Sequence, residues 1–409
     1  MRYLFYAPLL VALPHIALAE PLSFDEAVDL AATQAPSLRA RTLAIQSRQS
    51  AAIAAGELPD PKLGFGLDNF PISGPPAGSF SEDSMTMARV GIAQDVPNLA
   101  KRHARTGRAQ ADVAVAEAAN LSEARRVRVA TALAWIDLAY ADRRMAAVDA
   151  TITRLGALTS ASTSSVASGS ARPAQALDIR QAIASLEDRR SEVAAEVARA
   201  RATLSRWTGD PDPAIEGGVP AFAIDPAALR RAIGAHPDLG AATARTRQAE
   251  ADVTLARAEK RPDWGFDVAY QRRAERYGDM VSAGVTISLP LFAKKRQEPM
   301  IVASVATAGA ALAEQEDMRR SLAADLEAGL ADHVMHHEQW MRSKDTLLPL
   351  ARHKADLETA SYSAGRAGLL DVIQAQSTLA DTELQTLDRE GLVVRDAARL
   401  VLTYGGEDQ

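Results

Sequence analysis

The sequence predicts a mainly α-helical protein, built of long antiparallel helical hairpins, with a smaller part whose β-strands belong to a membrane β-barrel. Three observations predict this fold class. Two stretches alternate between apolar and polar residues over the length of a membrane-crossing strand. Long proline-free stretches rich in Ala, Leu and charged residues are typical of extended helices. The same order of elements then occurs twice along the chain.

The clearest alternation lies in residues 264–271 and 281–289. Aromatic and branched residues occupy every second position, and small or polar residues lie between them. Successive side chains of a strand point to opposite faces, so we expect an apolar face toward lipid and a small, polar face toward a lumen. An ordinary hairpin of a soluble sheet has the same alternation and remains the alternative at this point.

The first half of the chain predicts the same plan. Residues 22–56 are helical, with a capping box of Ser23 and Glu26 and an interruption at Pro36. A second alternating hairpin follows, and Met85 and Met87 share one face of its second strand. After it we expect a helix from 101 to about 157, a Ser/Thr/Gly turn over 159–173, and a helix over 174–207.

Matching positions indicate an internal duplication. The pairs are Pro36 with Pro237, Pro61 with Pro262, Pro97 with Pro290, and Leu177-Asp178-Ile179 with Leu370-Asp371-Val372. We therefore divide the chain into a first repeat at 20–209 (hairpin about 62–96, long helix pair 101–207), a linker with a short helix at 210–236, and a second repeat at 237–409 (hairpin about 264–289, long helix pair 296–403).

Composition and the N-terminus narrow the class of protein. Residues 1–19 have the pattern of a secretory signal peptide, with Arg2, a short apolar stretch and Ala17-Leu18-Ala19 as a cleavage site. The net charge of -6 shows no basic footprint for nucleic acid. The chain contains no cysteine, which excludes disulfides and thiolate metal sites.

The number of predicted strands has a consequence for assembly. Two hairpins supply four strands, whereas a membrane barrel needs at least about eight. Unpaired strand edges are not tolerated in lipid. The chain must therefore combine with copies of itself to close its sheet.

At this point the sequence resembles the TolC family of outer-membrane efflux proteins. The resemblance covers the mature chain and includes Leu22-Ser23-Phe24-Asp25-Glu26-Ala27, the two proline-bounded hairpins, and Tyr362-Ser363-Ala364-Gly365 before Leu370-Asp371-Val372-Ile373. The segment Val96-Pro97-Asn98-Leu99-Ala100-Lys101-Arg102 looks like the Pro-x-x-Gly-Lys-Arg segment of the heavy-metal branch, with Ala100 in place of the glycine.

The resemblance implies a homotrimer in the outer membrane of a Gram-negative bacterium, with a twelve-stranded barrel and a helical tunnel in the periplasm. It implies a periplasmic adaptor (membrane fusion protein) and an inner-membrane pump, of the RND type or another. It also places a periplasmic gate at Tyr362, Asp371, Asp178, Arg366 and Gln374. It implies adaptor contacts at the tips, at Gly169, Gly365, Leu369 and Leu370.

Each of these sites has a plainer interpretation. Tyr362 and Asp371 suit ordinary residues beside a turn, and the two glycines suit a simple connection between helices. His333, His336 and His337 could present imidazoles together on one helix and are weak metal candidates, but a solvated helix surface explains them as well. Met85 and Met87 could be soft ligands for Cu(I), although packing is the simpler explanation.

The function that we expect is a passive exit duct for metal cations or small toxic compounds, with no cofactor and no catalysis. No Gly-rich phosphate loop, His-Glu-x-x-His or Gly-x-Ser-x-Gly motif occurs in the sequence. The alternatives are an exit duct for type I protein secretion and a soluble periplasmic helical scaffold.

Overall fold

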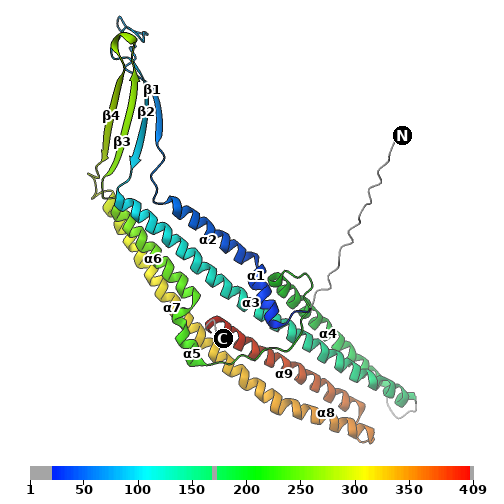
Figure 1. The fold of residues 1–409 in the computed structure, drawn as a ribbon. Coiled ribbons are helices and arrows are strands. Elements are labelled where there is room, and N and C mark those ends of the chain that lie inside the picture. Colours follow the sequence, from blue (N-terminus) through cyan, green and yellow to red (C-terminus); the bar gives the residue numbers. More distant parts are fainter. Residues whose placement is uncertain (1–20, 168–172, 406–409) are drawn as a thin grey trace, which may run out of the picture.

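The computed structural model describes residues 21–167 and 173–405, and it places a β-sheet at one end of a long helical body (Figure 1). The sheet contains β1 (Lys62–Asp68), β2 (Met87–Val96), β3 (Asp263–Arg272) and β4 (Met280–Ser288). These strands are antiparallel neighbours in chain order, so β2 and β3 join the two hairpins into one sheet. This confirms the expectation of four antiparallel strands beside long helices.

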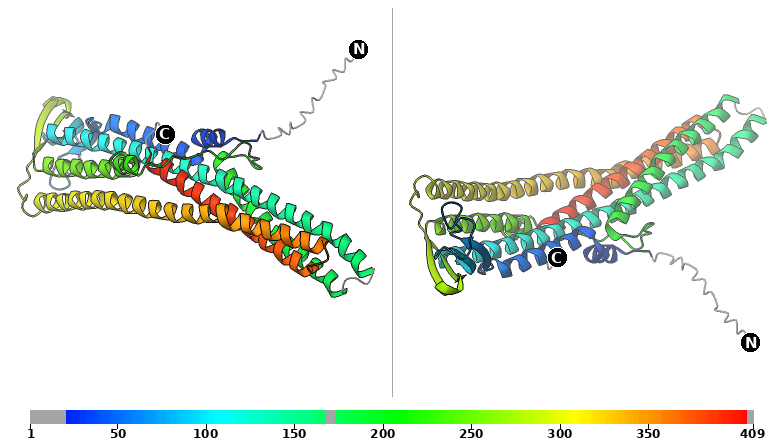
Figure 2. Two further views of the ribbon diagram at one scale, coloured as in Figure 1. Left: turned by 90° about the horizontal axis from the view of Figure 1, so that it is seen from below. Right: turned by 90° about the horizontal axis from the view of Figure 1, so that it is seen from above.

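The helices divide into an upper layer and a lower pair of hairpins. The bounds are α1 (Phe24–Gln34), α2 (Pro36–Ala54), α3 (Leu99–Ala167), α4 (Pro173–Thr208), α5 (Pro226–Ala232), α6 (Pro237–Ala258), α7 (Gln297–Arg342), α8 (Leu348–Ser363) and α9 (Leu369–Tyr404). Near the sheet α3 packs on α2 and α6, and α6 packs on α7, so these helices lie side by side as a curved layer (Figure 2). Farther away α3 pairs with α4, and α8 pairs with α9.

Local sequence explains where several helices begin. Ser23 caps α1 by accepting a hydrogen bond from the Glu26 backbone N–H, while the Glu26 carboxylate accepts one from the Ser23 N–H at 2.9 Å. Pro36, Pro226 and Pro237 occupy the first positions of α2, α5 and α6, where the missing N–H has no helical partner to lose. These features were readable in the sequence because each depends on neighbouring residues.

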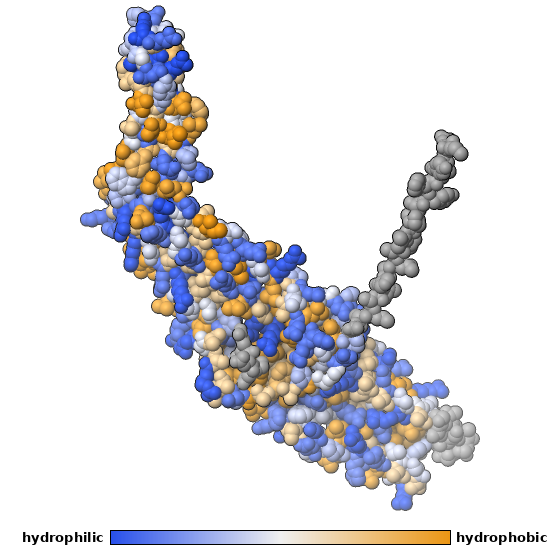
Figure 3. All heavy atoms as spheres, viewed as in Figure 1, coloured by the Kyte–Doolittle hydropathy of each residue, from blue (hydrophilic) through white to orange (hydrophobic). Residues whose placement is uncertain are grey.

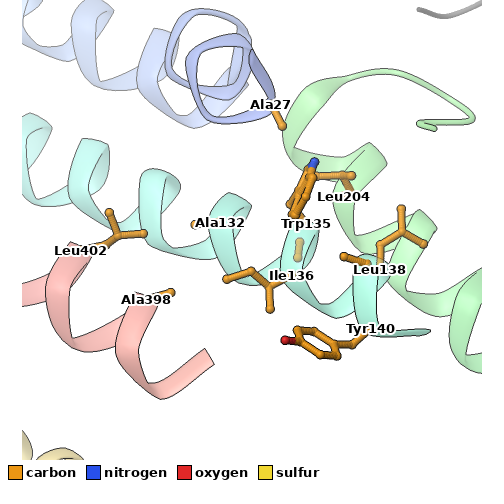
Figure 4. Close-up of a cluster of buried hydrophobic side chains, with 11 residues drawn as sticks. Ala27, Ala132, Trp135, Ile136, Leu138, Tyr140, Leu204, Ala398 and Leu402 are labelled. Atoms are coloured by element: carbon orange, nitrogen blue, oxygen red, sulfur yellow. The ribbon is translucent and has the colours of Figure 1, made fainter. Parts of the chain in front are cut away.

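The main hydrophobic core lies where α1, α3, α4 and α9 meet (Figure 4). Trp135 of α3 is fully buried there, and its indole N–H donates to the Leu22 carbonyl at 3.0 Å. Phe24 packs edge-on against Trp135 with ring centroids 5.6 Å apart. Ala132, Ala398 and Leu402 let α3 and α9 approach closely, so this core joins the first repeat to the end of the chain.

Two features of the long helices differ from the prediction. Helix α3 continues through residues 158–167, since Ser and Thr lower helix propensity only moderately and do not by themselves end a helix. The second long helix pair, predicted over 296–403, begins at Gln297, but a π-helical turn at Ser343–Leu347 divides its first helix into α7 and α8. Pro349 follows this turn and cannot donate to the Asp345 carbonyl, which accounts for the altered hydrogen bonding. The predicted signal peptide and Gly169 lie outside the described residues.

Candidate functional site

The sheet has one strongly apolar face. Its rungs align Leu63 with Ile92, Ile92 with Val268, and Val268 with Ala283. These side chains are exposed on this chain, with Phe65 at 74% and Val281 at 71% of their full accessible surface. Figure 3 shows the apolar residues as a band across the sheet, below a hydrophilic far end. An apolar band of this kind is covered by something other than the chain itself.

The opposite face is lined by small and polar residues. Gly91 lies against Ala269, and a Cβ at Gly91 would come within 2.9 Å of the Ala269 side chain. Gly284 lies under the Asp267 carboxylate, which a Cβ would approach to 2.5 Å. Because both positions are glycine, the neighbouring side chains can pack closely against the backbone. The Asp267 carboxylate lies on this face among small side chains.

A polar junction fixes the sheet to the helices. The Asp263 carboxylate, at the start of β3, accepts hydrogen bonds from the Asn98 backbone N–H and side-chain amide, both at 2.8 Å. Lys101 of α3 pairs with the same carboxylate at 2.5 Å. Arg102 donates to the Gly56 carbonyl at the end of α2 at 2.9 Å. The Pro-x-x-x-Lys-Arg segment therefore has a structural role here, joining α2, α3 and β3.

The two outer strands each have one neighbour within the described residues. β1 pairs with β2, and β4 pairs with β3. The remaining edges present unpaired backbone groups beside an apolar face. Such edges need a partner strand in lipid.

At the far tip, the structure brings one predicted gate residue, Tyr362, together with one predicted adaptor-contact residue, Leu369. Tyr362 of α8 packs against a buried cluster of Ile179 from α4 with Leu369 and Ile373 from α9. Leu369 is 2% exposed, so it lies inside this cluster and not on the surface where we expected an adaptor contact. Its neighbour Leu370 is 43% exposed and is the available apolar side chain.

The remaining predicted gate residues lie at the surface. Asp371, in the first turn of α9, accepts a hydrogen bond from the Gly368 N–H at 2.9 Å, which caps the helix. Arg366 and Gln374 are exposed, and Asp178 is half-exposed. Gly365 has a φ of 71°, as expected for the residue that ends α8. Within the described residues no ion pair joins Arg366 to either aspartate.

Two of the three histidines of α7 lie together, since the rings of His333 and His337 have centroids 6.1 Å apart. His336 Nδ1 lies 2.7 Å from an Asp396 carboxylate oxygen on α9. His337 packs against Trp340, and burial lowers the pKa of His333. Among the described residues no three histidine or acidic side chains are grouped in a way that could hold a metal ion.

The predicted methionine pair is divided. Met87 begins β2 and is buried, whereas Met85 lies in the turn before the strand and is exposed. The prediction that both belong to one strand face is therefore wrong. The chain turns at Asp83, whose carboxylate accepts from the Met85 N–H at 2.7 Å and delays the start of the strand.

A buried histidine lies where α3, α6 and α9 meet. His236 caps α6, because its Nδ1 accepts from the Asp238 N–H at 3.1 Å, and its ring lies 5.6 Å from that of Tyr404. Arg125 donates to the Thr403 and Gly405 carbonyls, both at 2.9 Å, beside it. Burial and the Arg125 charge lower the pKa of His236, against the opposing pull of Asp238.

Sequence reasoning missed the ion pairs between the two lower hairpins. Arg154 of α3 pairs with Glu383 of α9 at 2.9 Å, and Arg352 of α8 lies 3.5 Å from the same carboxylate. Arg144 of α3 pairs with Asp388 of α9 at 3.0 Å. In the two pairs between α3 and α9, the partners are more than two hundred residues apart in the sequence. No local sequence pattern could therefore indicate these ion pairs.

Comparison with known proteins gives consistent results. Residues 228–406 match the family model described as outer membrane efflux protein. The chain is 25% identical over 379 residues to the cobalt-zinc-cadmium resistance protein CzcC of Cupriavidus metallidurans, covering 90% of this chain and 86% of CzcC. No helix among the described residues is both long and apolar enough to cross a membrane.

Solved structures share the fold at low identity. A membrane protein from Pseudomonas aeruginosa superposes with a TM-score of 0.81 at 17% identity, over 94% of this chain and 90% of that one. The CmeC outer membrane channel of Campylobacter jejuni gives 0.79 at 11% identity, over 93% and 85%. The match to the family model, the fold, and the apolar sheet on a long helical body agree: residues 228–406 are similar to the outer membrane efflux protein family, and the chain shares the fold of solved outer membrane channels.

Proposed function

We propose that this chain is the outer-membrane channel subunit of a tripartite efflux system that expels heavy-metal cations. The observation that supports a channel is the sheet, which has an apolar outer face and two open edges and continues into the long helices. The similarity to a cobalt-zinc-cadmium resistance protein over most of both chains supports metal cations as the cargo.

Channels of this family form trimers that work with pumps and adaptors. In this chain β4 of one copy pairs with β1 of the next, and three sheets close into a twelve-stranded barrel. The same operation brings α7 of one copy beside α2 of its neighbour, because these helices are the outer members of the upper layer. The exposed apolar residues of both helices, such as Ile53, Val302 and Leu312, support this contact.

The tips of the lower hairpins carry the gate and the adaptor contact. Tyr362 holds α8 to the Ile179 cluster of α4, and Asp371 places a carboxylate at the exposed start of α9. Three copies of Asp371 around a narrow opening attract cations and repel one another. Leu370, beside Gly365, offers an apolar contact to the helical hairpin of an adaptor.

The cargo is tested in a strain that lacks this gene. We expect the deletion to lower tolerance to cobalt, zinc or cadmium, and plasmid-borne wild type to restore it, while tolerance to common drugs stays unchanged. Sensitivity to drugs with normal metal tolerance would contradict the cargo, and loss of a secreted protein alone would favour type I secretion. Recovery of the protein as a soluble monomer would contradict the channel.

The gate is tested by removing one charge and keeping the helix cap. Asp371→Asn retains an oxygen that accepts from Gly368, and Asp381→Asn on the exposed surface of α9 is the matched control. In planar bilayers at low salt we expect Asp371→Asn trimers to lose cation selectivity and control trimers to keep it. Equal selectivity of both variants and wild type would exclude Asp371 from the pore.

A further inference from the structure

The segment between β4 and α7 is unusually exposed for its composition. We call residues 289–296, Leu-Pro-Leu-Phe-Ala-Lys-Lys-Arg, the basal loop. It begins directly below the last rung of the sheet, where Asp263 faces Ser288. Leu291 is 77% exposed and Phe292 is 70% exposed, and three exposed basic residues follow them in sequence.

The internal duplication provides a direct comparison within the chain. The corresponding loop of the first repeat contains Asn98, Lys101 and Arg102, and all three side chains bind other parts of the chain. In the second repeat Leu291 replaces Asn98, so the amide that organises the first junction is missing. The residue of β1 that corresponds to Asp263 is Lys62, which offers no carboxylate and pairs with Asp95 at 2.6 Å.

The basic side chains of the basal loop have no partner in the part of the chain that the structure describes. No hydrogen bond or ion pair involves the side chains of Lys294, Lys295 or Arg296 among the described residues. The nearest carboxylate in sequence, Glu298, pairs with Lys260 at 3.1 Å. The loop of the first repeat therefore forms a junction inside the chain, whereas the basal loop exposes apolar and basic side chains.

This surface is continuous with the lipid-facing side of the sheet. Leu289 extends the alternation of Val281, Val285 and Ile287 by one more position. Trp264 pairs with Ile287 at the same level, and aromatic residues of membrane proteins gather where hydrocarbon meets headgroups. The basal loop connects β4 to α7 at the helical end of the sheet (Figure 1), which puts it just below the hydrocarbon on the periplasmic side of the membrane.

We propose that the basal loop binds anionic phospholipids of the periplasmic leaflet. Leu291 and Phe292 insert among the upper parts of the acyl chains. Lys294, Lys295 and Arg296 bind the phosphate oxygens of headgroups that carry a net negative charge. The inference depends on the location in the outer membrane and is independent of the cargo that the channel exports.

The test compares lipid retention by purified trimers. Wild type and Lys294→Gln/Lys295→Gln/Arg296→Gln are placed in nanodiscs of phosphatidylethanolamine with phosphatidylglycerol, and retained lipids are counted by native mass spectrometry after detergent extraction. The control, Arg180→Gln/Arg199→Gln/Lys354→Gln, removes the same charge from exposed positions of α4 and α8, which lie at the end of the helical body away from the sheet (Figure 1). We expect wild type and control to prefer phosphatidylglycerol, and the basal variant to lose at least about tenfold of that preference.

Two results would overturn the proposal. One is a wild-type trimer that retains both lipids equally, or a basal variant that keeps the preference. The other is a basal variant with unchanged lipid preference whose trimers dissociate at lower temperature, because the three charges would then act between subunits. The variant Leu291→Ser/Phe292→Ser tests the apolar part of the loop. We expect it to retain less of both lipids, while its trimers dissociate at the same temperature as wild type.

Discussion

At the scale of single residues, polar groups in this chain mostly secure helix ends and junctions. Asp371 caps α9, Asn98 and Asp263 connect α3 to β3, and His236 caps α6. The sequence could mark Asp371 as a capping residue because its partner Gly368 is three positions away. It could not reveal Asp263 or His236, whose partners include residues more than a hundred positions distant.

His236 should make the protein sensitive to acid. Its pKa in the folded protein is below the usual 6.5, so the unfolded chain takes up a proton first as pH falls. Stability is therefore lost as pH drops below about 6.5 toward the lower folded value. Protonation also removes the Nδ1 acceptor that caps α6, next to the Arg125 charge.

Two substitutions separate these effects. His236→Asn keeps a capping oxygen and cannot be protonated, so we expect its apparent melting temperature to fall less than that of wild type between pH 7.5 and 5.5. His236→Ala should cost about 1 kcal/mol at pH 7.5 because it removes the cap. The cost should be smaller at pH 5.5, where wild type has itself lost part of the stability that neutral His236 supplies. Identical acid dependence of wild type and His236→Asn would show that His236 does not carry the effect.

At the scale of elements, the long helices were predicted well where hydrophobic and proline patterns are local, and poorly where packing decides. The alternation of apolar and polar residues predicted the strands of both hairpins to within a few residues, although β2 begins later than expected. The π-helical turn at Ser343–Leu347 could not be read from the sequence. It depends on Pro349 and on the fit of Ser343, which is fully buried, against Thr386 of α9.

The π-helical turn should be held to α9 by a buried hydrogen bond. The Ser343 and Thr386 hydroxyls lie 2.8 Å apart, and Thr386→Val leaves the Ser343 hydroxyl without this partner in a buried site. We expect a loss of about 1–2 kcal/mol in stability to denaturant. Adding Ser343→Ala should recover part of the loss, since replacing both partners is close to neutral. Thr378→Val at an exposed position of α9 is the control, and additive losses in the double variant would contradict the pairing.

At the scale of the whole molecule, counting strands was enough to predict self-association, and the number of copies came from the family. The sequence also indicated which face of each strand meets lipid, because alternation assigns every second residue to one side. The relative placement of the lower hairpins was not predictable. It depends on Arg144, Arg154 and Glu383, whose charges look like ordinary exposed helix residues in the sequence.

The orientation of the sheet can be tested by placing one charge on each face. Val268 lies mid-strand on the apolar face, and Ser282 lies one rung away on the other. Val268→Lys should cost about 2–4 kcal/mol in the membrane and lower the amount of trimer in the outer-membrane fraction. Ser282→Lys should insert nearly as wild type does, and the reverse order of the two variants would invert our assignment of the faces.

The pairing of β2 with β3 has a consequence for how the ring assembles. Those rungs join the two repeats inside one polypeptide, so every second seam between hairpins of the proposed ring forms during folding, at a rate that does not depend on concentration. Only the seams between β4 and β1 require an encounter between chains. A chain holding a single repeat would need six copies to complete the same ring, with twice as many seams between chains, and each additional association step would leave an unpaired edge in lipid for longer.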